Sequence, residues 1–130
     1  MIYFAFFLVI INHFMTKSLI NSYTYIGLVL MIISLVFFTM ARIKLGNAFQ
    51  ASAKANKLIK DGIYKVIRHP IYLFGFTFIL GLIIFIQVFY GLIFLLILTV
   101  LQRKRIKNEE RVLEEKFGNE YLDYKKSTWF

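Results

Sequence analysis

The stretch IYLFGFTFILGLIIFIQVFYGLIFLLILTVL, Ile71–Leu101, decides how this chain folds. As a single helix rising about 1.5 Å per residue it would measure about 46 Å, whereas the hydrocarbon core of a bilayer is about 30 Å thick. Gln87, Tyr90 and Gly91 interrupt the apolar run near its middle. We therefore predict a helical hairpin, with helices at residues 70–86 and 90–106.

Two more apolar segments precede this hairpin, at residues 1–15 and 23–41, with the polar turn Thr16–Ser22 between them. The chain has 130 residues, 59% of them hydrophobic, and a mean hydropathy of +0.68. Apolar residues gathered in such blocks are typical of integral membrane proteins. The first segment lacks a basic start and a cleavage site, so we expect a retained helix rather than a signal peptide. The sequence predicts a single all-α integral membrane domain, residues 1–130, with about four transmembrane helices in two hairpins.

The basic residues indicate how these helices are oriented. All except Lys17 lie in two groups, Arg42–Arg68 and Arg103–Lys126, and Lys and Arg concentrate on the cytoplasmic side of membrane proteins. A single span in place of the hairpin would put the two groups on opposite sides. We therefore expect both termini in the cytoplasm, together with a connection at residues 42–69 and a helical tail at residues 107–130.

Composition also argues against several classes of function. The net charge of +9 comes from groups that flank the apolar segments, which favours a membrane surface over nucleic acid. The chain has no cysteine, so disulfides and thiolate metal sites are excluded. Its two histidines, His13 and His69, are too far apart for a metal-binding motif, so we expect no metal. Glycine-rich phosphate loops, the G-x-S-x-G elbow and the dinucleotide-binding fingerprint are absent from the sequence.

Arg68, His69 and Pro70 stand directly before the hairpin and form the first candidate site. Proline suits the first turn of a helix and favours an extended residue before it, so His69 should lie just outside the helix. The free backbone N–H groups of that turn attract anions, and Arg68 adds a planar cation. Tyr72 and Gly75 follow on the helix. These residues suit a carboxylate or phosphate ligand, although lipid headgroups, an interfacial tyrosine and helix packing also explain them.

Glu109 and Glu110 form a second candidate site soon after the hairpin. On a continuing helix, Ile106, Leu113 and Phe117 form one apolar face, and Glu110 lies within this face. An acid on such a face needs a partner. Pairing with basic residues of the same helix is one explanation. The other is a pocket shared by the two candidate sites, because a hairpin returns residue 109 to the side where residue 69 began.

Tyr121 and Tyr124 follow a helix break that we predict at Gly118. Such aromatic residues would lie on the membrane surface or form a lid over the shared pocket. The residues alone leave both explanations open.

Three segments of the chain resemble a known family. They read RIKLGNAF (Arg42–Phe49), LIKDGIYKVIRHPIYLFGF (Leu58–Phe76) and NEERVLEEKFGNEYLDY (Asn108–Tyr124). In this order and spacing they resemble the integral-membrane methyltransferases related to isoprenylcysteine carboxyl methyltransferase, and the kindred phospholipid N-methyltransferases. The resemblance covers residues 42–124. The chain departs from it in its ending, KSTWF, and in having only Gly27 where phospholipid methyltransferases often carry G-x-G.

The resemblance implies that S-adenosylmethionine binds in a pocket that faces the cytoplasm. The motif positions imply cofactor-binding roles for Tyr64, His69, Pro70, Tyr72, Gly75, Glu109 and Glu110. They imply catalytic roles for Arg68, His69 and Glu110. Arg68 would orient a substrate carboxylate, and His69 would position the cofactor or accept a proton. The acceptor would be a lipophilic or amphipathic carboxylate, amine or thiol from the bilayer. Because the amino-terminal part is short, a partner would complete the lipid-facing cavity, either another protein or a second copy of the chain in a homo-oligomer.

Two other functions are compatible with parts of this pattern. Membrane reductases of the sterol-reductase type share a segment like R-H-P-x-Y but bind NADPH, whose 2′-phosphate would want clustered arginines. The only arginine near this segment is Arg68. A small non-enzymatic membrane protein would explain the helices, but neither Glu110 on an apolar face nor the spacing of the three segments. The methyltransferase is therefore the function that the sequence favours.

Overall fold

The computed structural model describes residues 21–46 and 58–129, and the regular structure in these two ranges is entirely helical. The helices are α2 (Ser22–Leu45), the short 3-10 helix η2 (Gly62–Lys65), α3 (Pro70–Ile86), α4 (Gly91–Phe117) and α5 (Asn119–Ser127). The all-helical prediction is confirmed for this part of the chain. The predicted span at residues 1–15 and the end of the first family-like segment, residues 47–49, lie outside the described residues.

Of the helices in the described ranges, α2 is the one long and apolar enough to cross a membrane by length and composition, and α3 is a shorter apolar helix. Large apolar side chains are exposed along α2 and α4, among them Ile26, Val29, Ile33, Val36, Ile93, Leu96, Ile97 and Val100. Apolar surfaces of this extent mark contact with a membrane or a partner. Spans at residues 23–41, 70–86 and 90–106 stay predictions.

The start of α2 is fixed by Asn21. Its Oδ1 accepts hydrogen bonds from the backbone N–H and the hydroxyl of Thr24, both at 3.1 Å, and from Nε2 of Gln87 at 3.1 Å. An asparagine cap stabilises a helix start by about 1 kcal/mol. The bond to Gln87 also ties the start of α2 to the end of α3.

α2 and α3 approach closely where two glycines meet. A Cβ added to Gly27 would lie 2.5 Å from the backbone nitrogen of Phe85 and 2.7 Å from the carbonyl oxygen of Gly81, so the backbone could not stay where it is. The sequence suggested that Gly75 either admits a flat ligand or lets another helix approach. Among the described residues, a Cβ there would meet Phe38 alone, at 3.8 Å, so their packing does not require a glycine at that position. The tight contact lies further along α3.

The predicted break between α3 and α4 is confirmed. Gln87 follows α3 with φ 56° and ψ 30°, a left-handed conformation, and its backbone N–H donates to the carbonyl of Ile84 at 3.2 Å. α4 begins at Gly91, where a Cβ would lie 2.7 Å from the side chain of Ile83. α4 then continues past residue 106 into the charged sequence, because no proline or glycine interrupts it before Gly118.

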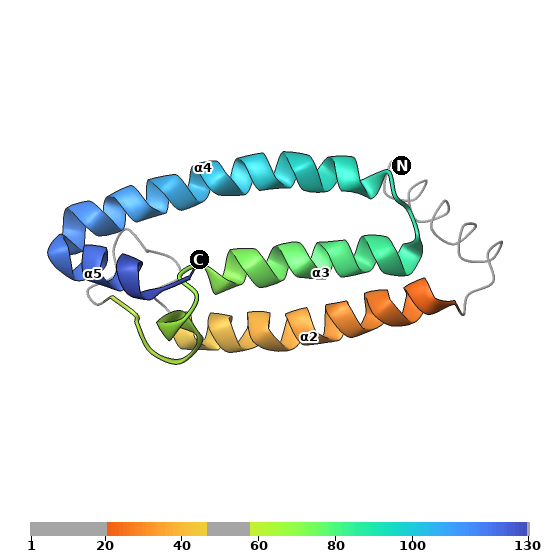
Figure 1. The fold of residues 1–130 in the computed structure, drawn as a ribbon, viewed down its shortest axis with the longest axis horizontal. Helices are drawn as coiled ribbons and strands as arrows, with labels where there is room; N and C mark the ends of the chain where they lie inside the picture. Colours follow the sequence, from red (N-terminus) through yellow and green to blue (C-terminus); the bar gives the residue numbers. More distant parts are fainter. Residues whose placement is uncertain (1–20, 47–57, 130) are drawn as a thin grey trace.

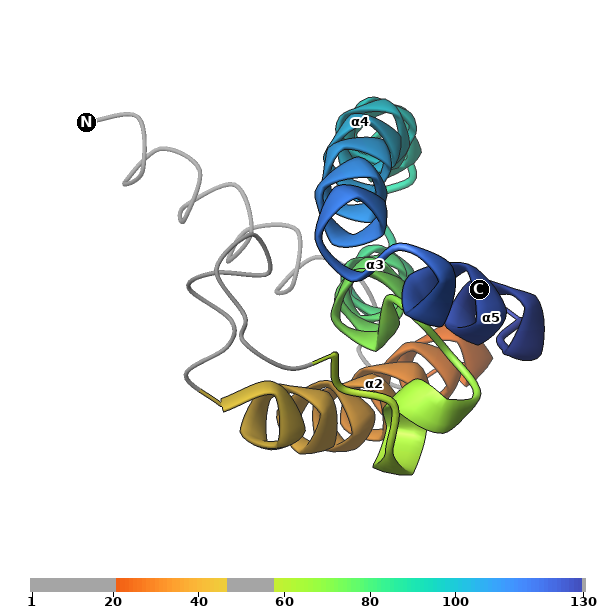
Figure 2. The same ribbon diagram turned by 90° about the vertical axis from the view of Figure 1, so that its left-hand side faces the viewer.

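α3 lies between α2 and α4, as the two perpendicular views show (Figure 1, Figure 2). The predicted break at Gly118 is confirmed: its φ is 53°, a conformation that glycine adopts without strain, and α5 returns from there toward the start of α3 (Figure 1). A small core forms at this end of the bundle, where Leu58, Tyr121 and Tyr124 are buried against Leu113 and Phe117. This core holds α5 against the end of α4 and against Leu58.

Candidate active site

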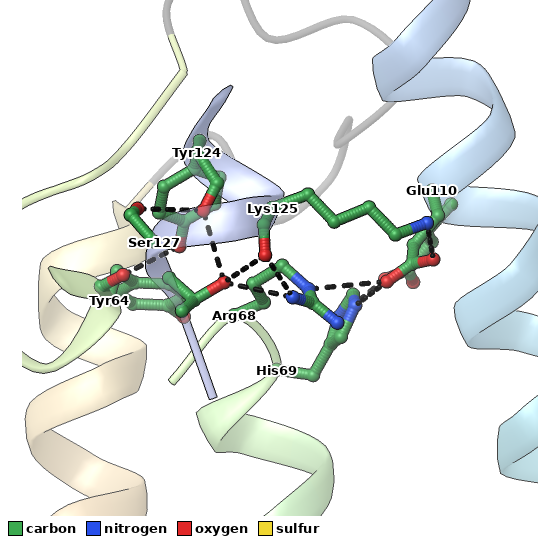
Figure 3. Close-up of polar contacts among 9 residues, drawn as sticks. Tyr64, Arg68, His69, Glu110, Tyr124, Lys125 and Ser127 are labelled. Atoms are coloured by element: carbon green, nitrogen blue, oxygen red, sulfur yellow. Dashed lines mark hydrogen bonds and ion pairs between the residues drawn. The ribbon is translucent and has the colours of Figure 1, made fainter. Parts of the chain in front are cut away.

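The candidate site lies where α3 begins, between the charged half of α4 and α5 (Figure 3). Pro70 occupies the first helical position, as predicted, because its missing N–H is not needed there. His69 precedes it, and its carbonyl accepts the N–H of Leu73 at 3.1 Å. With φ −121° and ψ 54°, His69 is outside the helical region, and its ring points toward Glu110 of α4.

Glu110 is the centre of the site. Its Oε1 lies 3.2 Å from Nε2 of His69 and 3.3 Å from Nε of Arg68, and its Oε2 lies 2.8 Å from Nζ of Lys125 on α5 (Figure 3). The side chains of His69 and Glu110 are 7% and 16% exposed. The acid on an apolar face therefore has partners from another part of the chain, and two of them are residues of the first candidate site.

Arg68 links α5 to this centre. Its Nη1 donates to the carbonyl of Lys125 and to Oγ1 of Thr128, both at 2.9 Å. Its Nε is buried and approaches Glu110 as an ion pair, without the geometry of a hydrogen bond. The guanidinium is thus held by α5, while one of its N–H groups lacks a hydrogen-bond acceptor among residues 21–46 and 58–129.

Burial and neighbouring charges set the protonation of the two central groups. Burial alone would raise the pKa of Glu110. Hydrogen bonds from Lys125 and His69, together with the charge of Arg68, outweigh burial and hold that pKa below its usual range. Burial lowers the pKa of His69, and the carboxylates of Glu110 and Glu109 offset this only in part. At neutral pH Glu110 is therefore ionised and His69 neutral, so that Nε2 of His69 carries the proton and Nδ1 the lone pair.

Glu109 lies beside this centre and is held by Tyr72. The hydroxyl of Tyr72 donates a hydrogen bond to Oε1 of Glu109, and Oε2 lies 4.0 Å from Nδ1 of His69. The rings of His69 and Tyr72 lie 6.1 Å apart between centroids. The predicted site residues that the structure brings together are therefore Arg68, His69, Tyr72, Glu109 and Glu110.

Tyr64, Pro70 and Gly75 have different surroundings. The buried Tyr64 donates from its hydroxyl to the carbonyl of Ala41 on α2 at 3.3 Å, and its own carbonyl accepts from the hydroxyl of Tyr124 at 2.6 Å. Pro70 is fully buried, and Gly75 lies further along α3. Tyr64 and Pro70 thus occupy framework positions, and a cofactor contact by any of the three stays a prediction.

Lys125 is the member of the site that sequence reasoning missed. It lies on α5 and reaches Glu110, 15 positions earlier in the chain. A lysine in a basic tail carries no signal of such a pairing, because the contact exists only after the chain reverses at Gly118. The i, i+4 rule for helices therefore could not find it.

Tyr121 and Tyr124 are buried, 1% and 7% exposed, which excludes the membrane-surface explanation. The hydroxyl of Tyr121 has no hydrogen-bond partner in the described part of the chain. Burial raises its pKa, and the nearby charge of Glu110 raises it further. The hydroxyl of Tyr124, in contrast, donates a hydrogen bond to the carbonyl of Tyr64. Tyr124 therefore ties α5 to η2, whereas the hydroxyl of Tyr121 faces Glu110.

A surface pocket of about 350 Å³ adjoins α5. It is lined by Lys60, Lys65, Glu120, Asp123, Tyr124 and Ser127, and this lining does not include Arg68, His69 or Glu110. The pocket is thus separate from the candidate site. Within the two described ranges, no group of three or more histidine or acidic side chains is placed to hold a metal ion.

Known proteins similar to this chain agree with one another. The sequence model of the phospholipid methyltransferase family matches residues 22–120. Protein-S-isoprenylcysteine O-methyltransferase of Saccharomyces cerevisiae is 32% identical over 108 residues, which cover 78% of this chain and 45% of that protein. The protein of the same name from Schizosaccharomyces pombe is 36% identical over 92 residues, 66% of this chain and 39% of its own. The chain thus spans less than half the length of these two relatives. No solved structure matches it.

Proposed function

Because the chain belongs to the phospholipid methyltransferase family, as its motif segments predicted, we propose that it is a membrane-embedded methyltransferase that uses S-adenosylmethionine. Its acceptor in this proposal is a lipophilic or amphipathic molecule delivered from the bilayer. The observation that carries the proposal is the meeting of two motif segments around a single carboxylate. One segment contains Arg68 and His69, and the other contains Glu109 and Glu110.

The residues at this site suit the polar part of S-adenosylmethionine. Glu109 and Glu110 offer carboxylate oxygens to an ammonium group or to ribose hydroxyls. Arg68 and the first turn of α3 offer donors to a carboxylate. Tyr72 and His69 add aromatic faces near which a sulfonium is stabilised. When bound, the cofactor supplies an electrophilic methyl group.

The chain's own residues would prepare the acceptor. Transfer needs the acceptor atom positioned in line with the methyl group and free of its proton. Because His69 is neutral at pH 7, its Nδ1 would take up the proton of an amine or thiol acceptor while its Nε2–H stays bonded to Glu110. A carboxylate acceptor needs no base, and Arg68 would orient it.

The two relatives favour a carboxylate acceptor, because their names specify O-methyl transfer to an S-isoprenylcysteine of a protein. Since the chain spans less than half of each, we take from them only the class of acceptor, an acidic group beside a long apolar tail. The exposed apolar side chains of α2 and α4 support the same class, because they suit a substrate that enters from the bilayer.

The location that we propose is a multi-pass membrane protein with both termini in the cytoplasm. The length and composition of α2 support membrane insertion. α4 changes from apolar to basic at Arg103, and the exposed Lys104 and Arg105 follow. Basic residues at the end of a span favour the cytoplasmic side. The candidate site lies at this charged end, so the cofactor would enter from the cytoplasm.

An NADPH-dependent reductase of the sterol-reductase type is the alternative that the sequence left open. Its nucleotide would need several cations around the 2′-phosphate. The candidate site brings one arginine, Arg68, together with two carboxylates, Glu109 and Glu110, which would repel a phosphate. Neither relative named above is a reductase. The reductase is therefore not favoured.

Methyl transfer tests the proposal directly. Membranes that contain the chain are incubated with S-adenosylmethionine carrying a tritiated methyl group and with N-acetyl-S-farnesylcysteine as the probe acceptor, and tritium is counted in the organic extract. We expect transfer that is lost in Glu110→Gln and kept in Glu114→Gln, an exposed position one turn further along α4. A folded protein that transfers no methyl group to this probe or to the membrane lipids would contradict the proposal.

A further inference from the structure

Glu110 is surrounded by an excess of positive charge, and one of its partners differs from the others. Arg68 and His69 are largely buried and belong to the segment that leads into α3. Lys125 comes from α5 and its side chain is 39% exposed, yet it makes the shortest contact, 2.8 Å from Nζ to Oε2. A long flexible side chain that is open to water can leave its partner without disturbing the fold. Lys125 is therefore the partner that can be exchanged.

The same arrangement leaves two buried donors beside Glu110 without a well-formed hydrogen bond. Nε of Arg68 and the hydroxyl of Tyr121 are buried, and neither has a hydrogen-bond partner in the described ranges. Buried polar groups are nearly always satisfied, so such orphans call for an explanation. The ammonium group of Lys125 offers no remedy, because it only donates. Both donors therefore depend on the single carboxylate of Glu110, which also holds the ammonium group of Lys125, so the site lacks a second acceptor beside that ammonium group.

A ligand that carries an ammonium group and a carboxylate on neighbouring atoms would satisfy both requirements. We propose that Lys125 is an internal substitute for the α-ammonium group of the cofactor's amino-acid end. When the cofactor binds, Lys125 leaves Glu110 to that ammonium group, and Arg68 Nε and the Tyr121 hydroxyl donate to the adjacent carboxylate. This inference rests on the proposed function, and it adds Tyr121 to the residues that bind the cofactor and makes Lys125 their competitor.

The exchange needs no opening of α5. Helix α5 and the two residues after it are held to the segment before α3 by four hydrogen bonds that do not involve the side chain of Lys125. The Tyr124 hydroxyl donates to the carbonyl of Tyr64 at 2.6 Å, and the N–H of Trp129 donates to the carbonyl of Val66 at 2.9 Å. Arg68 donates to Thr128 and to the backbone carbonyl of Lys125, both at 2.9 Å. Only the lysine side chain has to swing out, so the competition is local and small.

Calorimetric titration of the detergent-purified chain tests the exchange. S-adenosylhomocysteine carries the amino-acid group without the sulfonium charge, and 5′-methylthioadenosine lacks the amino-acid group. Lys125→Met should tighten binding of S-adenosylhomocysteine by about 1.5- to 5-fold, the weight of one partly exposed ion pair that no longer competes. The affinity of the Lys125→Met variant for 5′-methylthioadenosine should equal that of the wild type. Lys126→Met is the matched control, because Lys126 lies next on α5 and is highly exposed, and its ion pair within the described ranges is with Asp123 at 4.0 Å.

The outcomes are distinct. Weaker or unchanged binding of S-adenosylhomocysteine to Lys125→Met would overturn the inference while leaving the proposed function intact. Equal tightening for both ligands would overturn it too, because the effect would then not depend on the amino-acid group. If the wild-type protein binds neither ligand, the proposed function fails and the inference fails with it.

A measurement on the wild-type protein covers the case in which a variant does not fold. Brief acetylation followed by mass spectrometry reports the reactivity of each lysine amine. Saturating S-adenosylhomocysteine should raise the acetylation of Lys125, since its amine is released to water, and leave that of Lys126 unchanged. A fall or no change at Lys125 would contradict the exchange.

Discussion

Replacing Glu110 by glutamine is the most informative perturbation of the site. The variant keeps the size of the side chain and removes the charge that holds Arg68 and Lys125. Glu110 is 16% exposed, so solvent screens its interactions less than those of surface acids. A hydrogen bond to a charged group contributes about 1.5–3 kcal/mol. If the cofactor depends on one such bond to Glu110, its loss weakens binding by about 10- to 150-fold.

The assay is calorimetric titration of S-adenosylhomocysteine into the detergent-purified protein, with circular dichroism to confirm that the helices remain. Glu114→Gln is the control, because it makes the same chemical change at an exposed position of α4. We expect its affinity to stay within about twofold of the wild type, since exposed charges contribute little. An affinity of folded Glu110→Gln that also stays within that range would refute the placement of Glu110 in the binding site.

Three further predictions concern stability and are read as changes in thermal unfolding. Gly27→Ala should destabilise the protein by about 1–3 kcal/mol, because the added Cβ would meet backbone atoms at 2.5–2.7 Å. Gly75→Ala, the control, should leave stability unchanged or raise it. Equal effects of the two substitutions would contradict the glycine contact. Tyr124→Phe should destabilise the protein by about 1–3 kcal/mol, because it leaves the buried carbonyl of Tyr64 without its donor. Tyr121→Phe should not destabilise it, because the hydroxyl that it removes makes no well-formed hydrogen bond in the described ranges. A larger loss for Tyr121→Phe would contradict these contacts. Because the pKa of His69 is lowered, its contribution to stability is complete above about pH 6.5 and is lost as the pH falls through the lowered pKa. The His69→Gln variant should not show this loss of stability at low pH. Identical pH profiles of stability for the variant and the wild type would contradict the lowered pKa.

The sequence predicted the features of the fold that depend on neighbouring residues. The break between α3 and α4 was visible because Gln87 and Gly91 interrupt an apolar run, and the reversal at Gly118 because glycine ends a helix readily. The need of Glu110 for a partner was visible because an acid fell on an apolar helical face. Each of these follows from local sequence and helical periodicity.

Features that depend on the relative position of helices were not predictable in this way. The contact between Gly27 and Gly81 depends on where α2 and α3 cross, so the motif that contains Gly75 did not indicate it. The hydroxyl of Tyr64 bonds to the carbonyl of Ala41 on α2, which its motif did not indicate, and its contact with the cofactor stays a prediction. Lys125 pairs with an acid only because α5 folds back. Periodicity identifies a face of a helix but not what that face meets.

Binding of the candidate cofactors to the purified chain tests the central claim most directly. The detergent-purified protein is titrated by calorimetry with S-adenosylmethionine, S-adenosylhomocysteine and NADPH in parallel. The proposed function predicts saturable binding of the first two and none of NADPH. Binding of NADPH alone, or of none of the three by a protein whose helices are intact, would contradict it.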